Sequence, residues 1–154
     1  MIFDVLIIGG GVSGMQCALV LGSAKNKVFA AHKNIGIIMH QRASHLENAL
    51  FNNVLGLAPK TTGKDILIEG KEQLSTLYSH VSQLANEKVI AIKEINGMYL
   101  IDTNKNSYES KMVVFALNYS KPFTIQGLNE FIIPHKKANP EKDRIQLKND
   151  SYLI

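Results

Sequence analysis

The feature that most constrains the fold is a glycine string that directly follows an apolar run. Phe3 to Ile8 is almost continuously apolar, which is typical of a strand covered on both faces in a parallel sheet. The string Gly9-Gly-Gly-Val-Ser-Gly14 follows, and the small and aliphatic residues from Met15 to Ala24 predict a buried helix. With Val28 to Ala31 as the next strand, this order predicts a right-handed βαβ unit.

Each glycine of the string has a physical task in such a unit. Gly9 would make the tight turn, Gly11 would let the backbone approach a phosphate, and Gly14 would let helix and strand pack closely. The first helical N–H groups, at Val12 and Ser13, and about half a positive charge from the helix dipole favour a pyrophosphate. The same spacing also occurs in ordinary turns, but the strand before it and the helix after it favour a dinucleotide site.

An acidic residue about 20 positions further on normally binds the ribose of the dinucleotide. The predicted second strand ends at His32 and Lys33, with no Asp or Glu beside them. His32 is able to hydrogen-bond a ribose and Lys33 is able to meet a phosphate. The alternative, a solvated strand end, stays open.

The middle of the chain divides into an irregular part and a helix. Residues 33 to 60 show no sustained period and predict a functional loop, in which Arg42 is able to pair with a phosphate through two hydrogen bonds. His40 and His45 lie in the same predicted loop. Thr62-Gly-Lys-Asp65 then fits a capping box, and an apolar stripe at three-residue and four-residue steps predicts a helix that ends near Asn86.

The last third predicts mainly strands. Val89 to Ile95 and Met98 to Asp102 flank Asn96-Gly97, a strong signal for a tight hairpin. Met112 to Leu117 reads as another buried strand. Two prolines and mixed charges then predict a surface connection, with Arg144 to Leu147 as a last strand.

Composition limits the class of protein. The 154 residues are 45% hydrophobic and 19% charged, which predicts one folded globular domain over residues 1–154. The net charge of +4 comes without an arginine block or a nucleic-acid motif, so no nucleic-acid partner is indicated. Cys17 is the only cysteine, which excludes an internal disulfide and predicts a reducing cytoplasm. Neither a signal peptide nor a membrane-spanning run is indicated, and no metal site is expected.

The segment Asp4-Val-Leu-Ile-Ile-Gly-Gly-Gly-Val-Ser-Gly14 resembles the start of the FAD domain of thioredoxin-reductase-like flavoproteins, within the pyridine nucleotide-disulfide oxidoreductases. Further segments agree in order. Asn53-Val-Leu-Gly56 resembles the loop whose Asn reaches the flavin, and the hairpin near Ile92 corresponds to a strand whose backbone meets the adenine. Residues 112–118, with Ala116, Leu117 and Asn118, occupy the place of a strand that ends in Ala-Thr-Gly in the family. The resemblance implies an α/β, Rossmann-like FAD/NAD(P)-binding domain with a central parallel sheet and a small antiparallel hairpin layer.

The sequence also departs from that family. No Cys-x-x-Cys is present, which excludes the disulfide chemistry of thioredoxin reductases. The NADPH domain and the closing FAD segment are expected to be absent. At Asn118 a glycine would be usual, although Asn tolerates a left-handed backbone best among the other residues.

Three hypotheses follow. The first is an FAD-binding oxidoreductase-like protein that transfers electrons through flavin without a dithiol, with NAD(P)H or a redox partner protein as donor. The second is a non-catalytic nucleotide-binding remnant that acts through self-association, for example as a homodimer. The third is an NAD(P)-binding module, which the missing ribose carboxylate disfavours.

Overall fold

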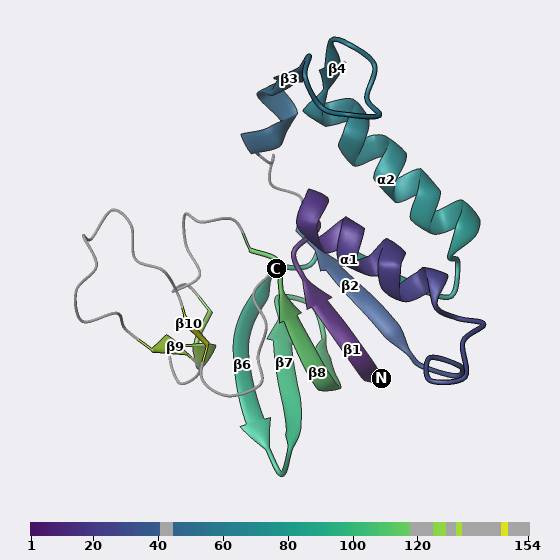
Figure 1. The fold of residues 1–154 in the computed structure, drawn as a ribbon. Helices are drawn as coiled ribbons and strands as arrows, with labels where there is room; N and C mark the ends of the chain where they lie inside the picture. The colour runs from purple at the N-terminus through teal and green to yellow at the C-terminus, as the bar shows by residue number, and fades with distance from the viewer. Residues whose placement is uncertain (41–44, 118–124, 129–131, 134–145, 148–154) are drawn as a thin grey trace.

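The fold is built on one six-stranded sheet in the order β5-β2-β1-β8-β7-β6 (Figure 1). The computed structural model describes residues 1–40, 45–117, 125–128, 132–133 and 146–147. Four neighbouring strands run parallel, and the sheet then continues through two antiparallel pairings. The strands are β1 (Ile2–Ile8), β2 (Ile35–Met39), β5 (Ser82–Ala85), β6 (Val89–Ile95), β7 (Met98–Thr103) and β8 (Ser107–Phe115).

The predicted first unit is confirmed for its strand, glycine turn and helix. β1 lies at the centre of the sheet, between β2 and β8, so its apolar run is buried on both faces. The helix α1 (Val12–Ser23) begins directly after the glycines, with Gly11 as its N-cap. Its residues Met15, Ala18 and Gly22 are buried.

The predicted second strand at Val28 to Ala31 is wrong. Those residues form turns, and the second strand is β2, which pairs parallel to β1 with Val5 opposite Ile35. All five residues of β2 are buried, whereas Val28 and Phe29 are exposed. Burial between two parallel neighbours therefore decides which apolar run becomes the strand, and the predicted loop over residues 33–60 contains the strand β2, between β1 and β5.

Helix α2 (Gly63–Leu77) begins as predicted and ends earlier. Thr62 accepts a hydrogen bond from the Asp65 N–H, and the Asp65 carboxylate accepts one from the Thr62 N–H, which completes the capping box. The prediction of an end near Asn86 is wrong, because Tyr78 leaves the helical conformation and residues 82–85 form β5 beside β2. The apolar stripe therefore passes from a helix into a strand.

The predicted hairpin is confirmed. Asn96 and Gly97 both have positive φ, 53° and 77°, as a tight turn of this type requires. β7 also pairs with β8, and β8 pairs parallel to β1, so the hairpin extends the central sheet. The predicted strand at Met112 to Leu117 is the second half of β8 and the two residues after it.

Three shorter pieces complete the description. The 3-10 helix η1 (His45–Asn48) leads to β3 (Leu50–Phe51), which pairs with β4 (Thr61–Thr62) just before α2. β9 (Ile132–Ile133) pairs with β10 (Gln146–Leu147). The last predicted strand, Arg144 to Leu147, is therefore seen at its final two residues, and Arg144 lies outside the described residues.

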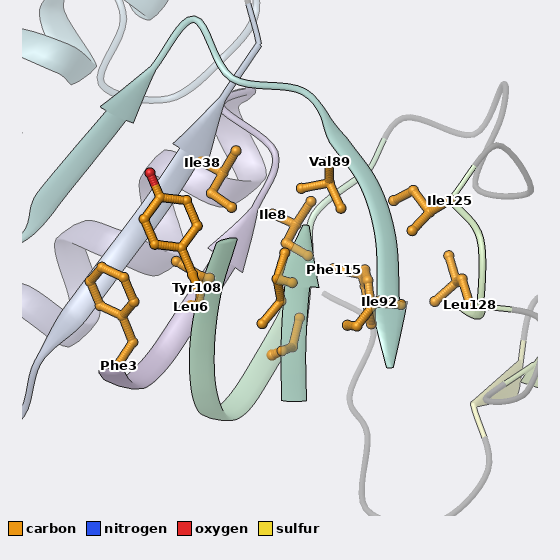
Figure 2. Close-up of a cluster of buried hydrophobic side chains, with 12 residues drawn as sticks. Phe3, Leu6, Ile8, Ile38, Val89, Ile92, Tyr108, Phe115, Ile125 and Leu128 are labelled. Carbon is orange, nitrogen blue, oxygen red and sulfur yellow. The ribbon is translucent and has the colours of Figure 1, made fainter. Parts of the chain in front are cut away.

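The core has two clusters, one on each face of the sheet. The first lies under both helices and includes Ile7, Met15, Ile37 and Leu74. The second gathers side chains of β1, β2, β6, β7 and β8 with those of residues 125–128 (Figure 2). In this second cluster Phe3 and Tyr108 meet edge to face, with 6.0 Å between ring centroids. The sheet thus lies between the two clusters and contributes side chains to both.

Candidate functional site

The candidate site is the glycine turn at the carboxyl ends of three parallel strands. Gly9 follows β1 and donates its N–H to the carbonyl of Ile38 in β2, at 3.0 Å. On the other side Ala116, just after β8, donates its N–H to the carbonyl of Ile8 at 2.9 Å. The turn therefore begins at the centre of the sheet edge, where open α/β sheets bind their ligands.

Gly9 and Gly14 are required by close backbone packing. Gly9 has a φ of +126°, and a Cβ on it would lie 2.2 Å from the carbonyl oxygen of Ala116. A Cβ on Gly14 would lie 1.8 Å from the carbonyl oxygen of Gly9. Both tasks predicted for these glycines, the tight turn and the close helix-strand contact, are what the geometry shows.

Gly11 differs from its neighbours because it has room for a side chain. Among the described residues, a Cβ at this position would meet no heavy atom within 4 Å. As N-cap of α1, Gly11 supplies no side-chain hydrogen bond, and the first turn carries no acidic residue. The start of α1 carries the positive end of the helix dipole, and Val12 and Ser13, which follow Gly11, are exposed.

The place of the ribose-binding carboxylate is taken by Met39. This residue ends β2, is 6% exposed, and packs so closely on Gly10 that a Cβ there would lie 2.6 Å from the Met39 Cγ. His40 follows and is exposed. A thioether is a weak hydrogen-bond acceptor, so the Met39 side chain offers no strong acceptor to ribose hydroxyls.

A carboxylate close to Met39, that of Glu87, already has partners inside the protein. Glu87 donates its N–H to the Met39 carbonyl, and its buried carboxylate accepts hydrogen bonds from Thr103, Asn106 and Tyr108 at 2.7 to 3.0 Å. Burial alone would raise the pKa of Glu87, but these three hydrogen bonds outweigh it and hold the pKa below its usual value. Glu87 therefore ties the hairpin to β2 as an ionised structural group.

The predicted residues His32 and Lys33 do not reach the glycine turn. They lie in the connection before β2, where the Lys33 ammonium is 3.5 Å from the Asp4 carboxylate in the first half of β1. Asp4 and Gly9 are five residues apart along a strand, about 16 Å. The prediction depended on a strand ending at Ala31, and the strand that does end at the site is β2.

Ile92 also differs from its predicted role. It lies in β6, its side chain is buried in the second core cluster, and its N–H donates to the carbonyl of Gln126 at 2.8 Å. Both its N–H and its side chain are used inside the protein. The predicted contact of its backbone with an adenine stays a prediction.

Of the other predicted residues that the structure describes, Ala116 lies beside the turn and Asn53 lies in a separate loop. Ala116 touches Gly9, and the partly buried Leu117 packs on the second core cluster. Asn53 is exposed in the loop between β3 and β4, which is closed by a hydrogen bond from the Lys60 N–H to Asn52. Arg42 and Asn118 lie outside the described residues.

Sequence reasoning missed Gly10 and Met39 as members of the site. The signal that could have identified Met39 as the end of a strand was the apolar run from Ile35 to Met39, which only Gly36 interrupts. A Cβ at Gly36 would come within 2.6 Å of Phe3 and 2.9 Å of Leu6, so this glycine marks close packing within a strand.

The single thiol lies outside this chemistry. Cys17 is partly buried on α1, and burial raises its pKa, which keeps it a neutral thiol. In the part of the chain that the structure describes, no three His, Cys, Asp or Glu side chains are grouped to hold a metal ion. Across the same residues, no helix has the length and apolar character needed to cross a bilayer.

Ferredoxin-NADP reductases are among the proteins that this chain resembles in sequence. Ferredoxin-NADP reductase of Streptococcus agalactiae is 25% identical over 117 residues, which are 75% of this chain and 34% of the relative. Ferredoxin-NADP reductase 1 of Bacillus cytotoxicus is 26% identical over an alignment that covers 99% of this chain and 40% of the relative. The chain thus spans about a third of the length of the first relative.

Solved structures share the fold. An oxidoreductase from Agrobacterium tumefaciens matches with a TM-score of 0.61 at 22% identity, over 75% of this chain and 36% of that one. A putative thioredoxin reductase from Bacillus anthracis also gives a TM-score of 0.61, at 20% identity, over 74% of this chain and 36% of that one. The predicted Rossmann-like α/β fold is confirmed.

The family profile decides the assignment. The pyridine nucleotide-disulphide oxidoreductase profile matches residues 3–152, nearly the whole chain. Members of this family are FAD-binding flavoproteins with NAD(P)H as electron donor, in agreement with the predicted cofactor. The predicted resemblance is thereby confirmed: the chain belongs to the pyridine nucleotide-disulphide oxidoreductase family.

Proposed function

We propose that the chain binds FAD at the glycine turn and forms the flavin-binding part of an oxidoreductase. The observation that carries this proposal is the open space at Gly11 beside the uncapped start of α1, between two glycines that are packed tightly. Gly56 and Gly97 are also uncovered among the described residues, but their positive φ favours glycine there, whereas the φ of −77° at Gly11 is open to any residue. A phosphate approaching the backbone there needs that space.

The residues present fit the pyrophosphate of FAD. Gly11 leaves room for it, and the N–H groups of Val12, Ser13 and Gly14 are oriented by α1 to donate to its oxygens. Gly9 and Ala116 fix the turn to the sheet, and Asn53 and Leu117 are proposed to lie nearer the flavin. Bound flavin supplies electron transfer between NAD(P)H and an acceptor, and with a single cysteine the chain contributes no dithiol.

The wider setting is part of the same proposal. We assign the chain to a cytoplasmic protein, on the ground of its single cysteine, and describe residues 1–154 as one FAD/NAD(P)-binding domain. NAD(P)H or a redox partner protein would supply the electrons, and a homodimer is the proposed assembly. The ferredoxin-NADP reductases among its relatives, whose name pairs a protein with a nicotinamide nucleotide, support an electron-transfer role.

The variant Gly11→Ala tests the proposal. Its Cβ would occupy open space at a φ of −77°, so the folded protein should keep its stability within about 0.5 kcal/mol. FAD binding, measured by flavin absorbance and by the thermal shift on adding FAD, should fall at least about tenfold, because the methyl group occupies the space of the phosphate.

The matched control is Gln16→Ala, an exposed position on the same helix, which should leave FAD binding unchanged. The proposal is wrong if the unaltered chain shows neither a flavin band nor a thermal shift with FAD. It is also wrong if Gly11→Ala binds FAD as well as the unaltered chain does.

Met39 favours a second candidate function, a nucleotide-binding remnant or an NAD(P)-binding module without catalysis. An apolar side chain ends the strand where a ribose acceptor is expected, which weakens the hold on any dinucleotide. The variant Met39→Glu should restore that acceptor and tighten FAD binding about tenfold, whereas Met39→Leu should not.

Bleaching of bound flavin by NADPH under anaerobic conditions would favour the enzyme, and a thermal shift with NAD(P)H alone would favour the NAD(P) module.

A further inference from the structure

The connection between α1 and β2, residues 24–34, forms a surface at the end of the sheet opposite the glycine turn (Figure 1). Connections between helix and strand in such folds usually take about 2–6 residues. This one is longer than the geometry requires. The chain nevertheless folds it into consecutive turns, closed by hydrogen bonds from the N–H groups of Lys27, Ala30 and Lys33 to carbonyls three residues earlier.

Two apolar side chains project from these turns. Val28 is 97% exposed and Phe29 is 77% exposed. Neither belongs to a core cluster among the described residues. The turns hold them outward, although most large apolar side chains of the nearby helix and strands are packed inside.

The surface around this pair is basic. Residues 24–34 include Lys25, Lys27, His32 and Lys33 and contain no Asp or Glu. Lys33 is near Asp4, which also accepts a hydrogen bond from Lys111 at 2.8 Å. Among the described residues, Lys25 and Lys27 have no ion pair, so their charge is available to an anionic partner.

We propose that this basic apolar loop, residues 24–34, binds a membrane surface that contains anionic lipid, with Val28 and Phe29 inserted among the headgroups. Apolar side chains flanked by lysines favour this boundary, because the apolar groups leave water and the ammonium groups meet lipid phosphates. Such contact at the surface needs no membrane-spanning segment.

The charge and shape of the loop favour lipid over a protein partner, a nucleic acid or a second copy of the chain. A stable protein interface buries about 800 Å² on each partner, far more than two projecting side chains offer. Single-stranded nucleic acid stacks its bases on aromatic rings, and the more exposed of the two side chains is Val28. A second copy of the chain would bring the same lysines together. Docked this way, the protein would turn its glycine edge away from the bilayer.

The test uses the whole chain and vesicles of defined composition. The chain contains no Trp, so Phe29→Trp places a single tryptophan at the proposed insertion point. We expect its fluorescence to shift to shorter wavelength with phosphatidylcholine vesicles that contain phosphatidylserine, and to stay unchanged with phosphatidylcholine alone. Co-sedimentation of the unaltered chain should show the same lipid preference.

Two double variants separate the apolar and the charged contributions. Val28→Ser with Phe29→Ser, and Lys25→Glu with Lys27→Glu, should each weaken vesicle binding about tenfold or more. The matched charge control, Lys64→Glu with Lys71→Glu on the exposed side of α2, should bind like the unaltered chain. Circular dichroism melts establish that every variant is folded.

The proposal is overturned if the chain binds neither kind of vesicle, if it binds both equally, or if the loop variants behave like the α2 control. Tighter binding to single-stranded RNA than to the anionic vesicles would also overturn it. FAD binding is measured separately, and its outcome does not affect these results.

Discussion

The two ends of the sheet, each proposed to bind another molecule, are built in different ways. At the carboxyl end, the glycine turn is built from backbone, and Gly9 and Gly14 are fixed because a single added carbon would overlap a carbonyl oxygen. At the amino end, the basic apolar loop is built from side chains that touch little of the protein, with Phe29 77% exposed. Substitutions at Gly9 and Gly14 should therefore destabilise the fold, and those at Val28 and Phe29 should change only binding.

The largest effect is expected from Gly14→Ala. Its Cβ would lie 1.8 Å from the Gly9 carbonyl oxygen, so α1 must move away from β1, which should lower the free energy of unfolding by about 3 kcal/mol or more. Urea denaturation followed by circular dichroism measures this loss. A stability equal to that of Gly11→Ala would show that the turn is not packed as described.

Next comes Glu87→Gln at the same end of the sheet. The buried carboxylate accepts three hydrogen bonds, and an amide NH₂ would face at least one of these donors, so we expect a loss of about 1–3 kcal/mol in the free energy of unfolding. The exposed Glu69→Gln serves as the control in the same denaturation experiment. Equal stability of the two variants would contradict the role given to Glu87.

A smaller, pH-dependent effect is expected from Asp4 near the amino end. The hydrogen bond from Lys111, with that of the Asn34 N–H, lowers the pKa of Asp4 from 3.8 to about 2. The folded state thus binds this proton less tightly than the unfolded state, so the stability from the carboxylate is complete above about pH 4 and is lost as the pH falls toward 2.

Asp4→Asn should therefore remove about 1 kcal/mol at neutral pH and reduce the fall in stability between pH 4 and pH 2. Melting temperatures measured across this range check the prediction. An unchanged slope would assign the acid sensitivity to other carboxylates, such as Glu87.

The smallest effect on folding is expected from Phe29→Ser in the basic apolar loop. Because the ring is exposed, the free energy of unfolding should change by no more than about 0.5 kcal/mol, while vesicle binding weakens. Urea denaturation and co-sedimentation on the same sample compare the two effects. A large loss of stability would mean that the loop contributes to the fold, and the contrast between the two ends would disappear.

Part of the fold and of the site was predictable because its signals are local. The capping box at Thr62 and Asp65 and the turn at Asn96-Gly97 depend on neighbouring residues, and both were confirmed. The tasks of Gly9 and Gly14 followed from a strand and a helix adjacent to them in sequence. Asn53, Arg42 and Asn118 rest on family resemblance alone and stay predictions.

The remainder depended on contacts between distant residues. Val28 to Ala31 and Ile35 to Met39 are both short apolar runs, and only pairing with β1 and burial under α1 and α2 select the second. That choice moves the end of the second strand from Ala31 to Met39. The expected ribose contact at His32 and Lys33 is lost with it, and so is the predicted continuation of α2, because β5 is needed beside β2.

The sequence by itself determined the glycine turn, the first strand and helix, and the hairpin, since these depend on steric limits and hydrogen bonds within a few residues. Only the tertiary structure decided which run became β2, and therefore that Met39 faces the turn while Val28 and Phe29 are left in solvent. The physical reason is that burial is a property of the assembled sheet: a short apolar run carries the same local preference whether its neighbours cover it or not.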